Sequence, residues 1–172
     1  DKKRKFIPVN IAILTISDSR TLKQDASGDF LIKKISDLGH LVYERKIIKD
    51  EISLIKKNIL LWSLNSKIDA IITTGGTGLT GRDSTPEAIL EIADKIIDGF
   101  GELFRQISFN KIGTSAVQSR AVGAIIKGTY VFALPGSTSA CQDAWNEILK
   151  FQLDNRYRPC NFIEIIPRLM EN

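Results

Sequence analysis

The sequence predicts an α/β fold, a three-layer αβα sandwich around a mostly parallel, mixed sheet. Short apolar runs rich in β-branched residues alternate with segments whose apolar residues recur at helical spacing. Polar or glycine-rich turns follow the apolar runs, and no internal repeat, low-complexity stretch or linker interrupts the series. We therefore expect the 172 residues, 43% of them hydrophobic, to form a single domain, residues 1–172.

The first part of the chain predicts strand, helix, strand and helix in turn. Residues 11–16 are mostly apolar and β-branched, which is typical of a strand buried on both faces. Residues 27–38 carry apolar side chains at helical spacing, and Gly39 follows as a C-terminal stop. Residues 41–48 predict a second strand, and Ser53 is expected to cap the helix after it.

A third strand is predicted at residues 70–74, and it leads directly into a glycine-rich loop. A helix is expected where this loop ends. Ser84 and Glu87 have the spacing of a capping box, and Pro86 suits a first helical turn, where its missing N–H costs nothing. Residues 88–97 are expected to supply the apolar stripe of this helix.

The second half of the chain adds an amphipathic helix and a hairpin. Residues 100–109 carry an aromatic stripe that we expect in the core or at a subunit interface. Two β-rich runs, residues 121–126 and 129–134, are separated only by Lys127-Gly128, which is typical of a tight hairpin. The hairpin contributes an antiparallel pair, so the sheet is predicted to be mixed.

Composition argues against several classes of function. The formal charge of +4, from 24 basic and 20 acidic residues, is modest and suits a small anionic ligand rather than nucleic acid. The basic residues near the start predict a flexible, solvated N-terminal tail over residues 1–8. No apolar run reaches the roughly 18 residues that a membrane helix needs, so no membrane span is expected.

The cysteines and the histidine predict no chemistry of their own. Cys141 and Cys160 are the only cysteines and lack CxxC spacing, so we expect two buried thiols in a reducing, cytoplasmic compartment. His40 is the only histidine, follows a helix-stopping glycine and is expected at a surface turn. Ser-His-Asp, Cys-His and His-metal catalysis are therefore not predicted.

Polar or glycine-rich turns follow four of the predicted strands. In an open α/β sheet, ligands gather at the carboxyl ends of the strands. We expect one crevice lined by Ser17-Asp18, Lys49-Asp50, residues 75–83 and Pro135-Gly136-Ser137. The last serine of this set is also expected to cap the final long helix.

The loop Gly75-Gly76-Thr77-Gly78 has the properties of an anion site. Its glycines allow a tight turn that brings several backbone N–H groups against a ligand, and the next helix adds its positive N-terminal end. The loop lacks the lysine of a P-loop and does not spell GxGxxG, so it matches neither common nucleotide fingerprint. The alternative interpretation is a turn that needs positive φ angles.

Two aspartates predict a metal ion beside this loop. A carboxylate next to bound phosphate would repel it unless a cation such as Mg²⁺ bridges the two, and Asp83 stands at the end of the loop. Asp50, at another strand end, is the second candidate ligand. The alternatives are a capping or loop role for Asp83 and a solvated turn for Asp50. The chemistry left is phosphoryl or nucleotidyl transfer assisted by backbone donors and metal.

Several segments, in this order, resemble the MoaB branch of the MoaB/MogA family of molybdenum cofactor biosynthesis. They are IAILTISDSR at residues 11–20, TTGGTGLTGRDSTPEA at 73–88, FGELFRQISFNKIGTSAVQSRAVGAI at 100–125, LPGSTSACQDAW at 134–145 and LDNRYRPCNF at 153–162. The resemblance spans residues 6–162 and implies a molybdopterin-binding α/β fold that assembles as a homotrimer or homohexamer. Large apolar candidates for the interface are Phe104, Phe109, Tyr157 and Phe162.

The resemblance also implies an activity. Active members transfer AMP from ATP to the terminal phosphate of molybdopterin with magnesium and release pyrophosphate. By the matching motifs, the two acidic functional and metal-binding positions fall on Asp50 and Asp83. The phosphate-loop positions fall on Gly75, Gly76, Thr77 and Gly78, and pocket-lining positions on Ser17, Asp18, Ser119, Arg120, Pro135, Gly136 and Ser137. Mg²⁺, ATP as co-substrate, molybdopterin as substrate or ligand, and other cofactor-biosynthesis proteins as partners are implied. The alternative is a non-catalytic molybdopterin-binding carrier, regulator or scaffold.

Overall fold

Within residues 1 and 3–171, which the computed structural model describes, six strands form one sheet in the order β2-β1-β3-β6-β5-β4. The strands are β1 (Asn10–Ile16), β2 (Leu41–Ile48), β3 (Ala70–Thr74), β4 (Lys95–Ile96), β5 (Val122–Ile126) and β6 (Thr129–Leu134). Strands β2, β1, β3 and β6 run parallel, whereas β5 is antiparallel to both β6 and β4. The predicted mostly parallel, mixed sheet is confirmed.

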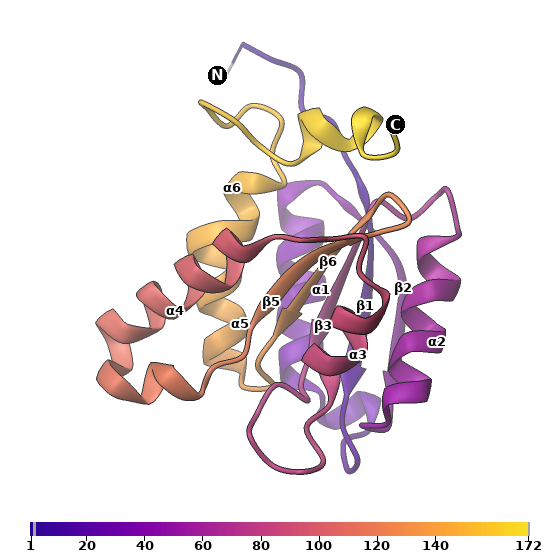
Figure 1. Ribbon diagram of the computed structural model, residues 1–172. Helices are drawn as coiled ribbons and strands as arrows, with labels where there is room; N and C mark the ends of the chain where they lie inside the picture. The colour runs from indigo at the N-terminus through magenta and orange to yellow at the C-terminus, as the bar shows by residue number, and fades with distance from the viewer. Residues whose placement is uncertain (2, 172) are drawn as a thin grey trace.

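Helices cover both faces of this sheet (Figure 1). They are α1 (Ala26–Leu38), α2 (Ile52–Ser63), α3 (Thr85–Ile92), α4 (Asp98–Ile112), and α5 (Thr138–Ala144), which continues through a π-helical turn (Trp145–Leu149) into α6 (Lys150–Gln152). Helices α1, α4 and α5 share one core cluster, and α2 and α3 share the other. The three-layer sandwich is confirmed. None of the helices in the described residues is long and apolar enough to cross a membrane.

Strand β1 is apolar at nearly every position because both of its faces are buried. Ile11 and Ile13 face the cluster that contains α1 and α5, whereas Ala12 and Leu14 face the cluster that contains α2. Successive side chains of a strand point to opposite faces, so a strand covered on both sides needs apolar residues at nearly every position.

Helix α3 is shorter than the sequence predicts. The apolar stripe is expected to run to residue 97, but the helix ends at Ile92 and Ala93 is extended. Lys95–Ile96 then pairs antiparallel with β5 as strand β4. The cause is tertiary, because a two-residue edge strand has no periodicity that could be recognised locally.

The three predicted serine caps have different outcomes. Ser137 caps α5, since its Oγ accepts a backbone N–H of the helix at 3.2 Å. Ser84 takes the N-cap position of α3 but makes no capping hydrogen bond, and its side chain is turned toward Asp50, to which the hydroxyl donates. The prediction for Ser53 is wrong, because α2 already begins at Ile52.

Two residues have the opposite exposure from the one expected. His40 is only 3% exposed, because Phe6 covers it with ring centroids 4.9 Å apart. Its Nδ1 accepts the backbone N–H of Val9 at 3.1 Å. The predicted surface turn is therefore wrong. Cys141 is buried as expected, but Cys160 is exposed, so the prediction of a second buried thiol is wrong.

The described part of the predicted tail contacts a late segment of the chain. Asn155 joins the two, since its Oδ1 accepts the backbone N–H of Ile7 at 2.9 Å and its Nδ2 donates to the carbonyl of Lys5 at 3.0 Å. These contacts do not test the flexibility expected of residues 1–8, which stays a prediction.

We expect the burial of His40 to make folding stability depend on pH. Burial lowers the pKa of His40 from 6.5 to about 4, because removal from water disfavours the charged ring. Since the folded pKa is depressed, the stabilising contribution is fully present above 6.5 and is lost as the pH falls to about 4. At about 1.4 kcal/mol per pKa unit, the free energy of unfolding should drop by about 3 kcal/mol, measured by urea unfolding across this interval.

A matched variant isolates this contribution from other titrating groups. The side-chain oxygen of His40→Asn can accept the Val9 N–H bond that Nδ1 accepts in the wild type. This variant should lose less stability than the wild type over the same pH interval. Equal losses in both proteins would contradict the assignment to His40.

Candidate functional site

The turns after β1, β3 and β6 meet at one edge of the sheet, because these strands are parallel neighbours. Ser17, Gly75 and Pro135 follow them directly. The backbone N–H of Gly75 donates to the carbonyl of Leu134 at 3.0 Å, which ties the glycine loop to the end of β6. The ends of these strands therefore lie close together, but the residues that follow the strands border more than one cavity.

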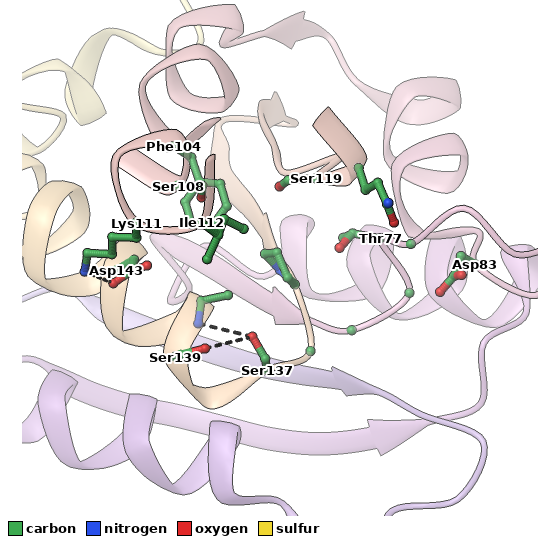
Figure 2. A pocket seen from close by; sticks show the side chains of 17 residues that line it. Thr77, Asp83, Phe104, Ser108, Lys111, Ile112, Ser119, Ser137, Ser139 and Asp143 are labelled. Atoms are coloured by element: carbon green, nitrogen blue, oxygen red, sulfur yellow. Dashed lines mark hydrogen bonds and ion pairs between the residues drawn. The ribbon is translucent and has the colours of Figure 1, made fainter. Parts of the chain in front are cut away.

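A cavity of about 420 Å³ opens between the glycine loop, the turn after β6, and helices α4 and α5 (Figure 2). The predicted residues that line it are Gly75, Gly76, Thr77, Gly78, Asp83, Ser119, Pro135, Gly136 and Ser137. Four predicted site residues do not line this cavity in the described part of the chain, namely Ser17, Asp18, Asp50 and Arg120. The predicted set is thus divided between the cavity wall and the structure around it.

The glycine loop turns through left-handed backbone. Gly75 and Gly76 have φ angles of +101° and +69°, so the loop does need positive φ, as the alternative interpretation holds. Thr85 fixes it from the start of α3, where its Oγ1 donates to the carbonyl of Gly75 and its N–H to the carbonyl of Gly76, both at 3.0 Å. This conformation is compatible with an anion site, because such a site needs a rigid backbone.

Two aspartates lie directly against this loop. A Cβ added at Gly76 would lie 2.7 Å from Oδ2 of Asp50, and one at Gly78 would lie 2.7 Å from Oδ2 of Asp83. Both distances are shorter than carbon and oxygen tolerate, so each carboxylate occupies space that only glycine leaves free. The two carboxylates come from different segments and meet different residues of the same loop.

Asp83 is held as an ionised carboxylate at the cavity wall. Its Oδ2 accepts two hydrogen bonds from Thr80, from the backbone N–H at 2.9 Å and from Oγ1 at 2.7 Å. The hydrogen bond from the Thr80 side chain, with smaller help from backbone N–H groups, lowers the pKa of Asp83 below its ordinary value. Asp83 therefore shapes the loop and also brings a negative charge to the cavity.

Asp50 lies beside the cavity. Its Oδ1 accepts the backbone N–H of Ser84 at 3.1 Å and Ser84 Oγ at 2.6 Å. It lines a neighbouring hollow together with Arg82 and Ser84. The carboxylate is largely buried, with only 8% of the residue exposed, so the alternative of a solvated turn is wrong.

Arg120 supports the glycine loop from outside the cavity. Its Nε donates to the carbonyl of Gly78 at 2.9 Å, and its Nη2 donates to the carbonyl of Asp83 at 3.2 Å. Arg120 also forms an ion pair with Glu87. The predicted capping box is therefore wrong, because Glu87 binds this arginine instead of the N-cap backbone.

The turn after β6 is fixed from behind in a similar way. The carbonyl of Gly136 accepts Arg20 Nη1 at 3.1 Å and Ser27 Oγ at 2.8 Å, and the carbonyl of Pro135 accepts Thr74 Oγ1 at 2.9 Å. Since these bonds come from β3, α1 and the turn before it, the sandwich itself holds this part of the cavity wall.

Sequence reasoning missed the wall that the helices contribute. It consists of Phe104, Ser108, Lys111 and Ile112 of α4, Gln118, and Ser139, Ala140 and Asp143 of α5. Phe104 is a predicted interface residue, but it is 1% exposed within this chain. No local pattern separates a helix face that borders a cavity from one that packs in a core, so the sequence carried no signal for this wall.

The cavity lining carries a net negative charge among the described residues. Its charged side chains are Asp83, Lys111 and Asp143, and the last two form an ion pair between α4 and α5 (Figure 2). Asp83 is therefore the charge that remains unbalanced, and it would repel a phosphate unless a cation joined it. Ser119 adds a polar atom at this wall, since its buried Oγ has no hydrogen-bond partner in the described part of the chain.

Comparison with known proteins gives consistent matches over most of the chain. A family model described as "Probable molybdopterin binding domain" matches residues 12–155. Molybdenum cofactor biosynthesis protein B of Escherichia coli strain K12 is 46% identical over 158 residues, which cover 92% of this chain and 93% of that protein.

Solved structures agree with the sequence matches. A crystal structure of a molybdenum cofactor biosynthesis protein B has a TM-score of 0.88 at 37% identity and covers 98% of this chain and 100% of its own. The tungsten cofactor synthesizing protein MoaB from Pyrococcus furiosus has a TM-score of 0.71 at 36% identity. The match covers 82% of this chain and 90% of that protein's chain. Both sequence and fold therefore lead to one assignment: the chain belongs to the MoaB/MogA family of molybdenum cofactor biosynthesis proteins.

Proposed function

We propose that this chain binds molybdopterin in the cavity beside the glycine loop and adenylylates it with ATP and Mg²⁺. One observation carries the proposal. Asp83 is held ionised against Gly78, in a cavity whose lining has no spare positive charge among the described residues. A site of this kind suits a phosphate ligand only when a cation accompanies it. The family description and the name of the Escherichia coli relative support molybdopterin as the ligand and cofactor biosynthesis as the role.

The reaction needs positioning more than reactive side chains. An oxygen of the pterin's terminal phosphate attacks the α-phosphorus of ATP, the bond to the β-phosphate oxygen breaks, and pyrophosphate leaves. The backbone N–H groups of Gly76 and Thr77, which line the cavity, are suited to stabilise the charge on the phosphates. A covalent intermediate on Cys141 is not part of the proposal, because burial raises the pKa of this thiol to about 11.

The residues beside the loop fit Mg²⁺ by their chemistry. Magnesium typically takes one or two protein carboxylates and fills its other positions with phosphate oxygens and water. Asp83 and Asp50 supply such oxygens, each against a different glycine of the loop. When bound, the ion would neutralise phosphate charge and polarise the phosphorus–oxygen bonds.

A non-catalytic carrier, regulator or scaffold is the second candidate, and one observation favours it. Asp50 lines the neighbouring hollow, so the two carboxylates border different spaces. If the two carboxylates do not hold one Mg²⁺ ion together, the site lacks the cation that the ATP phosphates need. The chain would then bind molybdopterin but not ATP. Calorimetric titration separates the two candidates, since tight pterin binding with no detectable binding of ATP and Mg²⁺ would assign the non-catalytic function.

The decisive experiment is incubation of the chain with molybdopterin, ATP and MgCl₂. We expect adenylylated pterin and pyrophosphate in equal amounts, and no product when the metal is chelated. Failure to form the product under conditions where both substrates bind would refute the enzymatic proposal.

We also propose that the chain assembles as a homotrimer or homohexamer. Several large apolar side chains of α4 and the turn after it are exposed, namely Leu103, Phe109, Ile112 and Val117. Of the other expected interface residues, Tyr157 is exposed, whereas Phe104 and Phe162 pack against the core around the sheet. A cytoplasmic location and contacts with other cofactor-biosynthesis proteins belong to the same proposal. Light scattering tests the assembly, and the mass of a single 19.2 kDa chain would contradict it.

A further inference from the structure

One carboxylate outside the cavity contacts both segments that carry the site aspartates. Asp18, in the turn after β1, accepts the backbone N–H of Asp50 on its Oδ1 at 3.1 Å. The same side chain accepts two hydrogen bonds from Arg82, from Nη2 to Oδ1 at 2.9 Å and from Nε to Oδ2 at 3.1 Å. Arg82 immediately precedes Asp83 in the chain. Asp18 is therefore bonded to residue 50 itself and to the neighbour of residue 83.

We infer that Asp18 is a positioning residue that helps to set the separation of Asp50 and Asp83, beside the direct hydrogen bonds between Ser84 and Asp50. This inference rests on the proposed function, because the separation matters for a cation held between the two carboxylates. It also gives Asp18 a different role from the ligand contact expected from the sequence, since Asp18 lies outside the lining of the cavity. Its effect would pass through two other residues.

The contact with Arg82 has the geometry that such a role requires. A guanidinium that binds a carboxylate with two parallel hydrogen bonds fixes direction as well as distance. The hydrogen bond from Arg82, helped by the backbone N–H of Asp50, lowers the pKa of Asp18, so the side chain is ionised at neutral pH. Thr80 and Arg120 anchor Asp83 from within its own loop and from the segment before β5. Ser84, which follows Asp83, binds the Asp50 carboxylate through its N–H and its hydroxyl, so Asp18 adds a second link between the two segments.

The same contact is not a major source of folding stability. The side chains of Arg82 and Asp18 are 63% and 44% exposed, and ion pairs in water contribute little to folding. This separates a positional effect from a structural one: removing Asp18 should change the site and leave the melting temperature almost unchanged.

The test compares Asp18→Ala and Asp18→Asn with a matched control. Asparagine keeps an acceptor for the Asp50 N–H but loses the charge that binds Arg82, so it separates the two contacts. The control is Asp37→Ala, which removes an exposed ion pair with Lys33 on α1, with a 2.8 Å contact and side chains 50% and 71% exposed. Three quantities are measured on the full chain: kcat and KM for adenylyl transfer, Mn²⁺ affinity by EPR in the presence of ATP, and the melting temperature.

We expect Asp18→Ala to lower kcat about 100-fold with little change in the KM for molybdopterin, because a displacement of about 1 Å has effects of this size. Mn²⁺ affinity should fall in the same variant. Asp18→Asn should lose about 10-fold in kcat, and the control should match the wild type. All melting temperatures should agree within about 2 °C.

The outcomes separate this inference from the proposed function. Wild-type kcat and Mn²⁺ affinity in Asp18→Ala would overturn the inference and leave the function standing. If the wild-type chain forms no adenylylated pterin, the proposed function fails, and Mn²⁺ affinity alone then decides the inference. Unchanged affinity in both Asp18 variants, or no Mn²⁺ binding by the wild type, would overturn it. If alanine lowers the melting temperature, the kcat and Mn²⁺ affinity of the asparagine variant decide instead.

Discussion

Replacing Asp83 with asparagine is expected to retain the fold and to lower adenylyl transfer by at least about 100-fold. The side-chain oxygen of asparagine can accept the two Thr80 hydrogen bonds that Asp83 accepts at 2.9 and 2.7 Å, so the loop should keep its conformation. The variant lacks the negative charge of the Asp83 carboxylate, which these bonds keep ionised at neutral pH. It also lacks one carboxylate oxygen suited to bind Mg²⁺. Initial rates over a range of molybdopterin concentrations measure the loss, and thermal unfolding checks the fold.

Asp143→Asn is the matched control for this variant. Asp143 also lines the cavity, but it forms an ion pair with Lys111 on α4, so its charge is already balanced. We expect a much smaller loss of transfer from Asp143→Asn than from Asp83→Asn. Equal losses would assign the effect to the overall charge of the cavity, and full turnover in Asp83→Asn would exclude a role for its carboxylate.

Much of the fold could be predicted because its signals are local. A strand covered on both faces is apolar at successive positions, as residues 11–16 are. Gly39 takes a φ of +101° after α1, and in the hairpin turn both Lys127 and Gly128 take positive φ, at 49° and 78°. These positions depend on a few neighbouring residues, so the sequence pattern determines them.

Several of the predictions that failed depend on residues far apart in the sequence. The local pattern predicts that the Ser84 oxygen accepts a helix N–H, but the side chain is turned toward Asp50, 34 residues away, to which its hydroxyl donates. His40 is buried because residues distant in the sequence, Phe6 and Leu153 among them, lie against it. In each case tertiary contacts override a sound local expectation, because burial and hydrogen bonding stabilise more than the local preference does.

The residues of the candidate site also differ in whether they are close in the sequence or brought together only by tertiary packing. Gly75 to Gly78 and Asp83 are close in sequence and could be recognised together, whereas the wall with Lys111 and Asp143 forms only when α4 packs against α5. Asp50 shows an intermediate case. Its position at a strand end was predictable, but its placement in a neighbouring hollow follows from how Ser84 holds its carboxylate.

Replacing Asp25 with alanine is expected to destabilise the fold by about 3–5 kcal/mol, the usual cost of breaking a buried ion pair. Asp25 is fully buried, and it accepts Thr15 Oγ1 at 2.6 Å, the Gly28 N–H at 3.0 Å and Arg45 Nη2 at 2.9 Å. Burial alone raises the pKa of this carboxyl, but these hydrogen bonds outweigh it, so the pKa lies below its ordinary value. Alanine would leave the Thr15 hydroxyl and the Gly28 N–H without this acceptor and would remove one of the acceptors of Arg45.

The exposed neighbour Asp29 provides the control, because it binds the same guanidinium from the other side. Arg45 Nη1 donates to Asp29 at 2.8 Å, yet the Asp29 side chain is 61% exposed and that of Asp25 is 0% exposed. Asp29→Ala should therefore cost only about 0–1 kcal/mol in the same urea-unfolding measurement. If burial of the acceptor sets the cost, the two variants must differ widely, although each removes one carboxylate from Arg45. Similar losses in both would mean that the charge of Arg45, and not the burial of Asp25, determines the stability of this part of the sandwich.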